Sequence, residues 1–149
     1  LACASLGIDI KYATPIGFEP DADIVSRAVA MASEKGSSIV SSNDPVEAVS
    51  DAGVVYTDVF VSMGEESLDG KMDAFDGFQI NEELVSHADS DYLFMHCLPA
   101  HRGEEVTNGV IDSKNSVVFD QAENRMWAQM SLLTRMCNEV AWHTYNELY

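Results

Sequence analysis

Short runs of apolar residues divide the chain into predicted strands. Ile8, Ile10 and Tyr12 alternate with polar residues, which predicts a strand over Ile8–Ala13. Compact apolar runs predict four further strands, at Ser38–Ser41, Gly53–Thr57, Tyr92–Met95 and Ser116–Phe119. The polar stretch Ser62–Gly70 has no periodicity and is predicted to be a loop.

Residues that begin or end helices stand between these runs. The first residues predict the end of a helix that Gly7 closes, and Asp21 and Gly36 bracket a predicted helix that reaches about Lys35. Further helices are predicted from Asn43 or Asp44 through Val49, over Glu82–His87 behind the cap Asn81, over a short piece after Glu105, and from Asp120 onward.

Strands that alternate with helices predict an α/β fold. We expect one domain over residues 1–149, with a three-layer Rossmann-like parallel sheet covered by helices on both faces. The chain opens on part of a helix, so this sheet is expected to lack its first strand. The final helix has too many apolar residues for one narrow face, namely Trp127, Met130, Leu132, Leu133, Met136, Val140, Trp142, Tyr145 and Leu148. We therefore expect a missing neighbour.

The charge balance narrows the possible partners. The formal net charge is −17, with 25 acidic residues against 8 Lys and Arg, so nucleic acid is not an expected partner. A cationic or zwitterionic small substrate suits such a field, although solubility or a salty habitat explains the charge equally well. No apolar run approaches the roughly 18 residues of a membrane helix. Three widely spaced cysteines favour a reducing, cytoplasmic setting.

Ligands of parallel sheets bind beyond the carboxyl ends of strands, which directs attention to segments 58–64, 96–102 and 120–125. In the second segment, Cys97 beside His96 could be a nucleophile, or a metal ligand together with His101. A buried thiol at a strand end is the stronger interpretation, because adjacent strand residues point to opposite faces. Pro99 keeps Leu98 out of the helical region and is compatible with a cis bond.

Two charged residues in the other segments are candidates for ligand binding. Asp58 follows an apolar strand, where it either holds an ammonium group or caps a turn. Gly64 and the polar residues after it are typical of a loop that closes over a ligand. Arg125 lies near the positive end of the last helix, against the local dipole, where it either faces a ligand or pairs with Glu123.

Three segments together resemble motifs of the ornithine carbamoyltransferase family. The segments are YTDVFVSMG, HCLPAHRGEEV and FDQAENRMWAQ, in the family's order and spacing. The resemblance implies the C-terminal, ornithine-binding domain of an enzyme that moves a carbamoyl group from carbamoyl phosphate to the δ-amine of ornithine. Citrulline and phosphate are the products. The chemistry requires no cofactor, and we expect no metal.

The resemblance also implies roles for individual residues. Asp58 binds the α-amino group of ornithine, and Ser62 and Met63 contact its α-substituents from the closing loop. Cys97 lies beside the δ-amine, with a thiol pKa that a neighbouring cation is expected to lower. Two further groups, the Leu98 carbonyl and Arg125, touch the carbamoyl group, and Arg125 polarises its oxygen. His96 shapes the loop.

The chain also departs from the family's pattern. It has neither the Ser-Thr-Arg-Thr nor the His-Pro-x-Gln segment that binds carbamoyl phosphate, and it lacks the Gly-Asp-x-x-Asn motif that contacts ornithine. Trp127 and Met130 stand where the family often has His and Lys. We expect the carbamoyl-phosphate-binding domain to be absent and the isolated chain to be inactive. The trimer of intact family members is built through that domain, so self-association is expected instead.

Three alternative functions remain open. A carbamoyltransferase for putrescine or another amine needs only a changed loop. A non-catalytic amino-acid-binding module would keep the acceptor site alone. A nucleotide-binding domain ranks last, because no glycine-rich phosphate-binding motif occurs in the chain.

Overall fold

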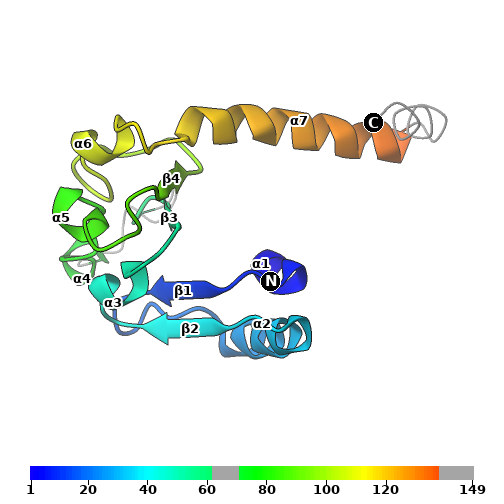
Figure 1. Ribbon diagram of the computed structural model, residues 1–149, viewed down its shortest axis with the longest axis horizontal. Coiled ribbons are helices and arrows are strands. Elements are labelled where there is room, and N and C mark those ends of the chain that lie inside the picture. The colour runs from blue at the N-terminus through cyan, green and yellow to red at the C-terminus, as the bar shows by residue number, and fades with distance from the viewer. Residues whose placement is uncertain (62–70, 138–149) are drawn as a thin grey trace.

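The computed structural model describes residues 1–61 and 71–137, which form an α/β fold with parallel strands (Figure 1). In chain order the elements are α1 (Ala2–Leu6), β1 (Ile10–Ala13), α2 (Ala22–Lys35), β2 (Ile39–Ser42), α3 (Pro45–Val49), β3 (Val54–Thr57), α4 (Lys71–Ala74), α5 (Glu82–Val85), β4 (Leu93–His96), α6 (Asn108–Ile111) and α7 (Val118–Cys137). The α/β class predicted from the sequence is confirmed.

Helix ends fall at the capping residues that the sequence contains. The Asp21 carboxylate accepts hydrogen bonds from the backbone N–H groups of Asp23 and Ile24, and Gly36 ends α2 in the left-handed conformation, with φ 74°. Gly7 closes α1 in the same way. Asp44, rather than Asn43, caps α3, and Asn81 accepts a hydrogen bond from the N–H of Leu84 at the start of α5.

The four strands form two parallel pairs. β1 pairs with β2, beginning at Ile10 opposite Ile39, and β3 pairs with β4, from Val54 opposite Leu93 to Thr57 opposite His96. Among the described residues these pairs are two separate two-stranded sheets. Since both pairs are parallel, the strands of each pair end at the same edge.

The predicted strand at Ser116–Phe119 is wrong. This segment contributes a single bridge to β4, in which Phe94 donates to the Asn115 carbonyl and accepts from the N–H of Val117. The N–H of Gln121 then bonds to the Val117 carbonyl, and α7 begins at Val118. The first residues of α7, Val118 and Phe119, are therefore helical although residues of this type are common in strands. The short helix α4 had no counterpart in the sequence prediction.

The main core lies around β3 and β4. Its buried residues come from both strands, from helices α3, α5 and α6, from the start of α7 and from the connecting segments: Val49, Val55, Ile80, Leu84, Val85, Tyr92, Phe94, Val106, Val110, Ile111 and Val118. A second, smaller cluster joins α1 to α2 through Ala4, Ala28 and Ala32. Small side chains let these two helices approach closely.

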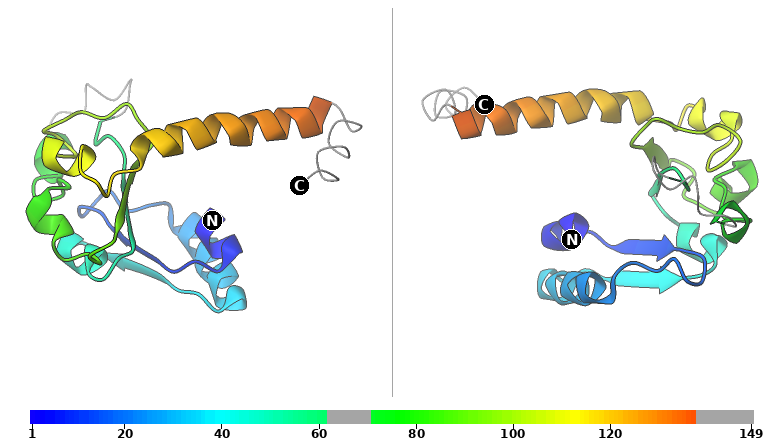
Figure 2. Two further views of the ribbon diagram at one scale, coloured as in Figure 1. Left: turned by 45° about the horizontal axis from the view of Figure 1, so that its top comes forward. Right: turned by 180° about the vertical axis from the view of Figure 1, so that it is seen from behind.

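Helix α7 projects away from this body, and α1 and α2 extend toward the same side of the molecule (Figures 1 and 2). Only Val118, at its start, is buried. Seven large apolar side chains farther along are exposed: Phe119, Met126, Trp127, Met130, Leu132, Leu133 and Met136. The remaining apolar residues of the predicted final helix lie outside the described residues. In the described part of the chain no helix is long and apolar enough to cross a membrane.

Candidate functional site

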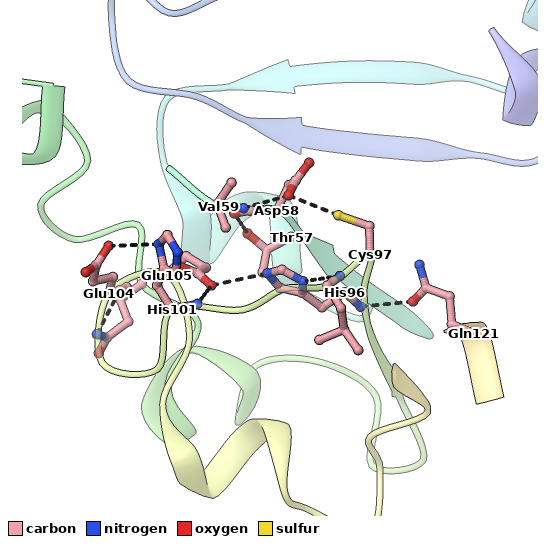
Figure 3. A network of polar contacts seen from close by, with 11 residues as sticks. Thr57, Asp58, Val59, His96, Cys97, His101, Glu104, Glu105 and Gln121 are labelled. Atoms are coloured by element: carbon pink, nitrogen blue, oxygen red, sulfur yellow. Dashed lines mark hydrogen bonds and ion pairs between the residues drawn. The ribbon is translucent and has the colours of Figure 1, made fainter. Parts of the chain in front are cut away.

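The candidate site lies where β3 and β4 end side by side. Because Thr57 is in register with His96, the residues that follow them, Asp58 and Cys97, are brought together. The Cys97 thiol donates a hydrogen bond to Asp58 Oδ1, with 3.0 Å between the sulfur and oxygen atoms (Figure 3). Asp58 also accepts from the N–H of Val59 at 2.8 Å. This pair joins the first two of the three segments expected at the strand ends.

The electrostatics of this pair keep the thiol protonated and the carboxyl ionised. Partial burial raises the pKa of the Cys97 thiol, and the hydrogen bond to Asp58 and the negative charge of Asp58 raise it further. The hydrogen bond from Cys97 lowers the pKa of Asp58, against an opposing effect of burial, and the Val59 N–H lowers it further. The expectation that a neighbouring cation lowers the thiol pKa is wrong, because the neighbour is a carboxylate.

Tyr56 is a member of the site that sequence reasoning missed. It lies two residues before Asp58 on β3, and alternate strand residues share a face. Burial and its proximity to Cys97 raise the pKa of the Tyr56 hydroxyl, and contact with Gln121 opposes this. The two-residue spacing from Asp58 is the signal that would have found it.

His96 fixes the loop that follows β4, as expected. Its side chain is fully buried, and its Nδ1 accepts a hydrogen bond from the N–H of Leu98 at 2.9 Å. Its own N–H donates to Gln121 Oε1 on α7 at 3.0 Å (Figure 3). Gln121 was also missed. The site is therefore tied to the start of the last helix.

Glu105 holds the far end of the same loop. It is fully buried, and its Oε1 accepts a hydrogen bond from the N–H of His101 at 2.6 Å. The same oxygen lies 3.2 Å from His96 Nε2, an ion-pair distance (Figure 3). Sequence reasoning missed Glu105, because glutamate in a polar stretch is normally exposed. His96 and Glu105 together set the path of residues 97–105.

Leu98 has an unusual backbone conformation within this loop. Its φ is 56°, in the left-handed region, and the Leu98–Pro99 peptide bond is cis. The exclusion of Leu98 from the right-handed helical region, expected from Pro99, is confirmed.

Arg125 is the one charged candidate that does not contact the Asp58–Cys97 pair. It is exposed on α7, and among the described residues no carboxylate lies within ion-pair distance of it. The alternative pairing with Glu123 does not form; Glu123 Oε1 accepts a hydrogen bond from Trp127 Nε1 at 3.2 Å instead. Arg125 lies one turn beyond Gln121 on the same helix face, so it extends the face that meets the site.

Ser62 and Met63 lie outside the described residues. A hollow of about 700 Å³ is lined in part by Phe60, two residues after Asp58, but its lining does not include Asp58 or Cys97. Its lining residues are Phe60, Met72, Asp73, Phe75, Asp76, Gly77, Gln79, Asn81, Gly103 and Glu104. We place the chemistry at the strand ends rather than in this hollow, because the paired polar side chains are there.

Residues 1–136 match the aspartate/ornithine carbamoyltransferase family in its Asp/Orn binding domain. The chain belongs to this family. It is 57% identical over 137 residues to a catabolic ornithine carbamoyltransferase of Thermoplasma acidophilum, a match that covers 91% of this chain and 45% of that protein. It is 52% identical over 141 residues to an ornithine carbamoyltransferase of Pyrococcus horikoshii, covering 94% of this chain and 44% of the relative.

The fold agrees with solved structures of this family. The ornithine carbamoyltransferase of Pyrococcus furiosus superimposes with a TM-score of 0.85 at 54% identity, over 89% of this chain and 43% of that one. The chain therefore spans less than half the length of the relatives it matches. The resemblance stated from the three motifs is confirmed at the level of the family and its acceptor-binding domain.

Proposed function

We propose that residues 1–149 are the ornithine-binding domain of an ornithine carbamoyltransferase. The intact enzyme transfers a carbamoyl group from carbamoyl phosphate to the δ-amine of ornithine. The observation that carries this proposal is the Asp58–Cys97 pair, held at 3.0 Å at the ends of adjoining strands. The pair occurs in a chain that is 57% identical to a catabolic ornithine carbamoyltransferase.

Asp58 and Cys97 bind different amino groups of ornithine. Asp58 is exposed and its lowered pKa keeps it anionic, so it binds the α-ammonium group of ornithine. The neutral Cys97 thiol lies beside the δ-amine and orients it toward the donor. Ser62 and Met63 contact the α-substituents from the loop after β3. Orientation of a neutral amine is the main requirement of the reaction.

Arg125 and the Leu98 carbonyl act on the carbamoyl group. The amine nitrogen attacks the carbonyl carbon, the bond from that carbon to the phosphate oxygen breaks, and the proton that the amine loses leaves with the phosphate. Negative charge develops on the carbonyl oxygen, where a guanidinium stabilises it. The exposure of Arg125 and its lack of an ion pair among the described residues leave it available for this role.

A second body of protein completes the sheet and supplies the donor site. Among the described residues β1 pairs only with β2, and β3 pairs only with β4. A strand between β1 and β3 would join the pairs into one parallel sheet with helices on both faces, the three-layer arrangement. The same body would cover the exposed apolar side chains of α7. We propose that it binds carbamoyl phosphate and builds a homotrimer in the intact enzyme.

The proposed setting is the cytoplasm. All three cysteines are free, which fits a reducing compartment. Ornithine and carbamoyl phosphate are the proposed small-molecule partners. The proposed chemistry uses only the side chains and backbone groups named above.

The test is citrulline formation by this chain, alone and mixed with the donor-binding half of the Thermoplasma acidophilum relative. We expect citrulline only in the mixture. Arg125→Ala should lower the rate at least a hundredfold, because it removes the stabilising cation. The matched control is Arg27→Ala, which removes an exposed arginine of α2 and should leave the rate unchanged.

Two results would overturn the proposal. Citrulline formation by the chain alone would show that it contains a donor site. A mixture whose rate is equal for the Arg125→Ala and Arg27→Ala variants would remove Arg125 from the reaction.

A further inference from the structure

Three potential metal ligands gather on the loop between β4 and α6, outside the Asp58–Cys97 pair. They are the imidazole of His101 and the carboxylates of Glu104 and Glu105, and one ligand atom from each lies within 4.8 Å of the other two. His101 Nδ1 is 3.4 Å from Glu104 Oε2, and both side chains are about half exposed, at 49% and 48% (Figure 3). The group is open to solvent on one side and closed by Glu105 on the other.

Glu105 provides an independent indication of a ligand. Its Oε1 is used by the N–H of His101 and lies beside His96, whereas its Oε2 is buried and has no hydrogen-bond partner among the described residues. A buried oxygen of a carboxyl group without a partner is costly. Such exceptions are rare in folded proteins and call for a specific explanation, such as a bound ion.

The basic groups beside these carboxylates are two imidazoles, those of His96 and His101. The nearest basic residue in sequence, Arg102, is engaged elsewhere, because it forms a bidentate ion pair with Asp112 and a hydrogen bond to Asn108. Two imidazoles, which carry no charge unless protonated, therefore face two carboxylates. The local charge favours a bound cation.

We propose that His101, Glu104 and Glu105 form a binding site for a divalent first-row metal ion such as Mn²⁺. One nitrogen and two carboxylate oxygens suit these ions. The three ligand atoms are at most 4.8 Å apart, so there is a point between them that lies within about 2.8 Å of each. Metal–ligand distances are about 2.0–2.2 Å for nitrogen and oxygen. Small rotations of the exposed His101 and Glu104 side chains close this difference, and water completes the coordination.

The ion would brace the loop that carries the candidate site. Glu105 already holds His96 and the backbone of His101, and His96 accepts from the N–H of Leu98. A metal that joins Glu105 to His101 and Glu104 would link both ends of this network. Binding to the folded state alone also raises thermal stability, by an amount that grows with the logarithm of the metal concentration once the site is saturated.

The experiment is a titration of the full chain with Mn²⁺, followed by electron paramagnetic resonance of the free ion. Mn²⁺ is chosen because it prefers oxygen ligands over the three thiols. We expect one saturable site that binds at least tenfold more weakly after His101→Ala or Glu104→Gln. The matched controls are His87→Ala and Glu83→Gln, which remove another exposed histidine and another exposed glutamate. They should bind as the unchanged chain does.

A second readout needs no assumption about affinity. Mn²⁺ should raise the melting temperature of the unchanged chain and of both controls, and should not raise that of His101→Ala. Equal Mn²⁺ binding by all five proteins would overturn the proposal and leave only diffuse attraction to an acidic surface. Loss of the site in Asp58→Asn but not in His101→Ala would overturn it too, and would place the ion beside Cys97. None of these results depends on citrulline formation.

Discussion

The region around β3 and β4 and the helix α7 contain similar apolar side chains in opposite environments. Phe94 on β4 is fully buried, whereas Leu133 on α7 is 58% exposed. The buried polar side chains of the first region, His96 and Glu105, also contact other groups of that region. The β3–β4 region buries its apolar side chains within the described chain, whereas α7 leaves its own exposed, as the proposed packing of α7 against a further part of the protein requires.

The largest expected effect separates these two regions directly. Phe94→Ala should lower the free energy of unfolding by about 3–5 kcal/mol, because it opens a cavity in the main core. Leu133→Ala should change it by no more than about 0.5 kcal/mol, because the side chain is largely in solvent already. Urea denaturation of the chain alone measures both. Similar losses for the two variants would contradict the comparison.

A second substitution tests whether the polar contacts of the β3–β4 region are structural. Glu105→Ala should cost about 3 kcal/mol, because it leaves the buried His96 without its partner and the His101 N–H without its acceptor. Glu104→Ala should cost no more than about 1 kcal/mol, because its pairing with His101 is half exposed. Urea denaturation in a metal chelator separates this effect from any bound ion. Equal losses would show that burial of Glu105 contributes nothing.

A third experiment tests the electrostatics of the site through its pH dependence. Since Asp58 raises the pKa of the Cys97 thiol, the thiolate forms only above the usual pH range of a cysteine. Asp58→Asn removes that charge, so the pKa should fall and alkylation of Cys97 by iodoacetamide at pH 8 should speed up by about tenfold per unit of pKa. Peptide mass spectrometry measures the rate, with Cys137 as the internal reference. Slower alkylation in the variant would reverse the assigned sign.

The smallest expected effect concerns α2, whose first turn is stabilised by hydrogen bonds to the neighbouring residue Asp21. Asp21→Ala should lower the free energy of unfolding by about 1 kcal/mol, because it removes the acceptor for the N–H groups of Asp23 and Ile24. Ser26→Ala, farther along the same helix, should change it by less than half as much. Thermal unfolding followed by circular dichroism compares the two variants. An equal effect would show that the cap does not limit the stability of α2.

Local chemistry explains why much of the fold could be predicted from the sequence. The caps Asp21 and Asn81 and the closing glycines Gly7 and Gly36 act on neighbouring backbone groups, so their effect depends little on the rest of the chain. The strand at Ser116–Phe119 failed because its apolar residues suit either structure. There the tertiary contact with Phe94 extends over one bridge only.

The candidate site was predictable only in part. Asp58 and Cys97 follow apolar strands, and the rule for parallel sheets placed both at the same edge. The charge state of the Cys97 thiol depends on its contact with Asp58, and the spacing of the two residues in the sequence does not reveal that contact. Glu105 and Gln121 lie 9 and 25 positions from His96 along the chain, and only the folded path of the loop brings them to it. The roles of Ser62, Met63 and Arg125 stay predictions.

The most direct test of the proposed acceptor site is the kinetics of Asp58→Asn in the mixture with the donor-binding half. Loss of the carboxylate that binds the α-ammonium group should raise the KM for ornithine at least a hundredfold and leave the KM for carbamoyl phosphate within about twofold. An unchanged KM for ornithine, or an equal rise in both values, would contradict the assignment of Asp58 and Cys97 as the ornithine site.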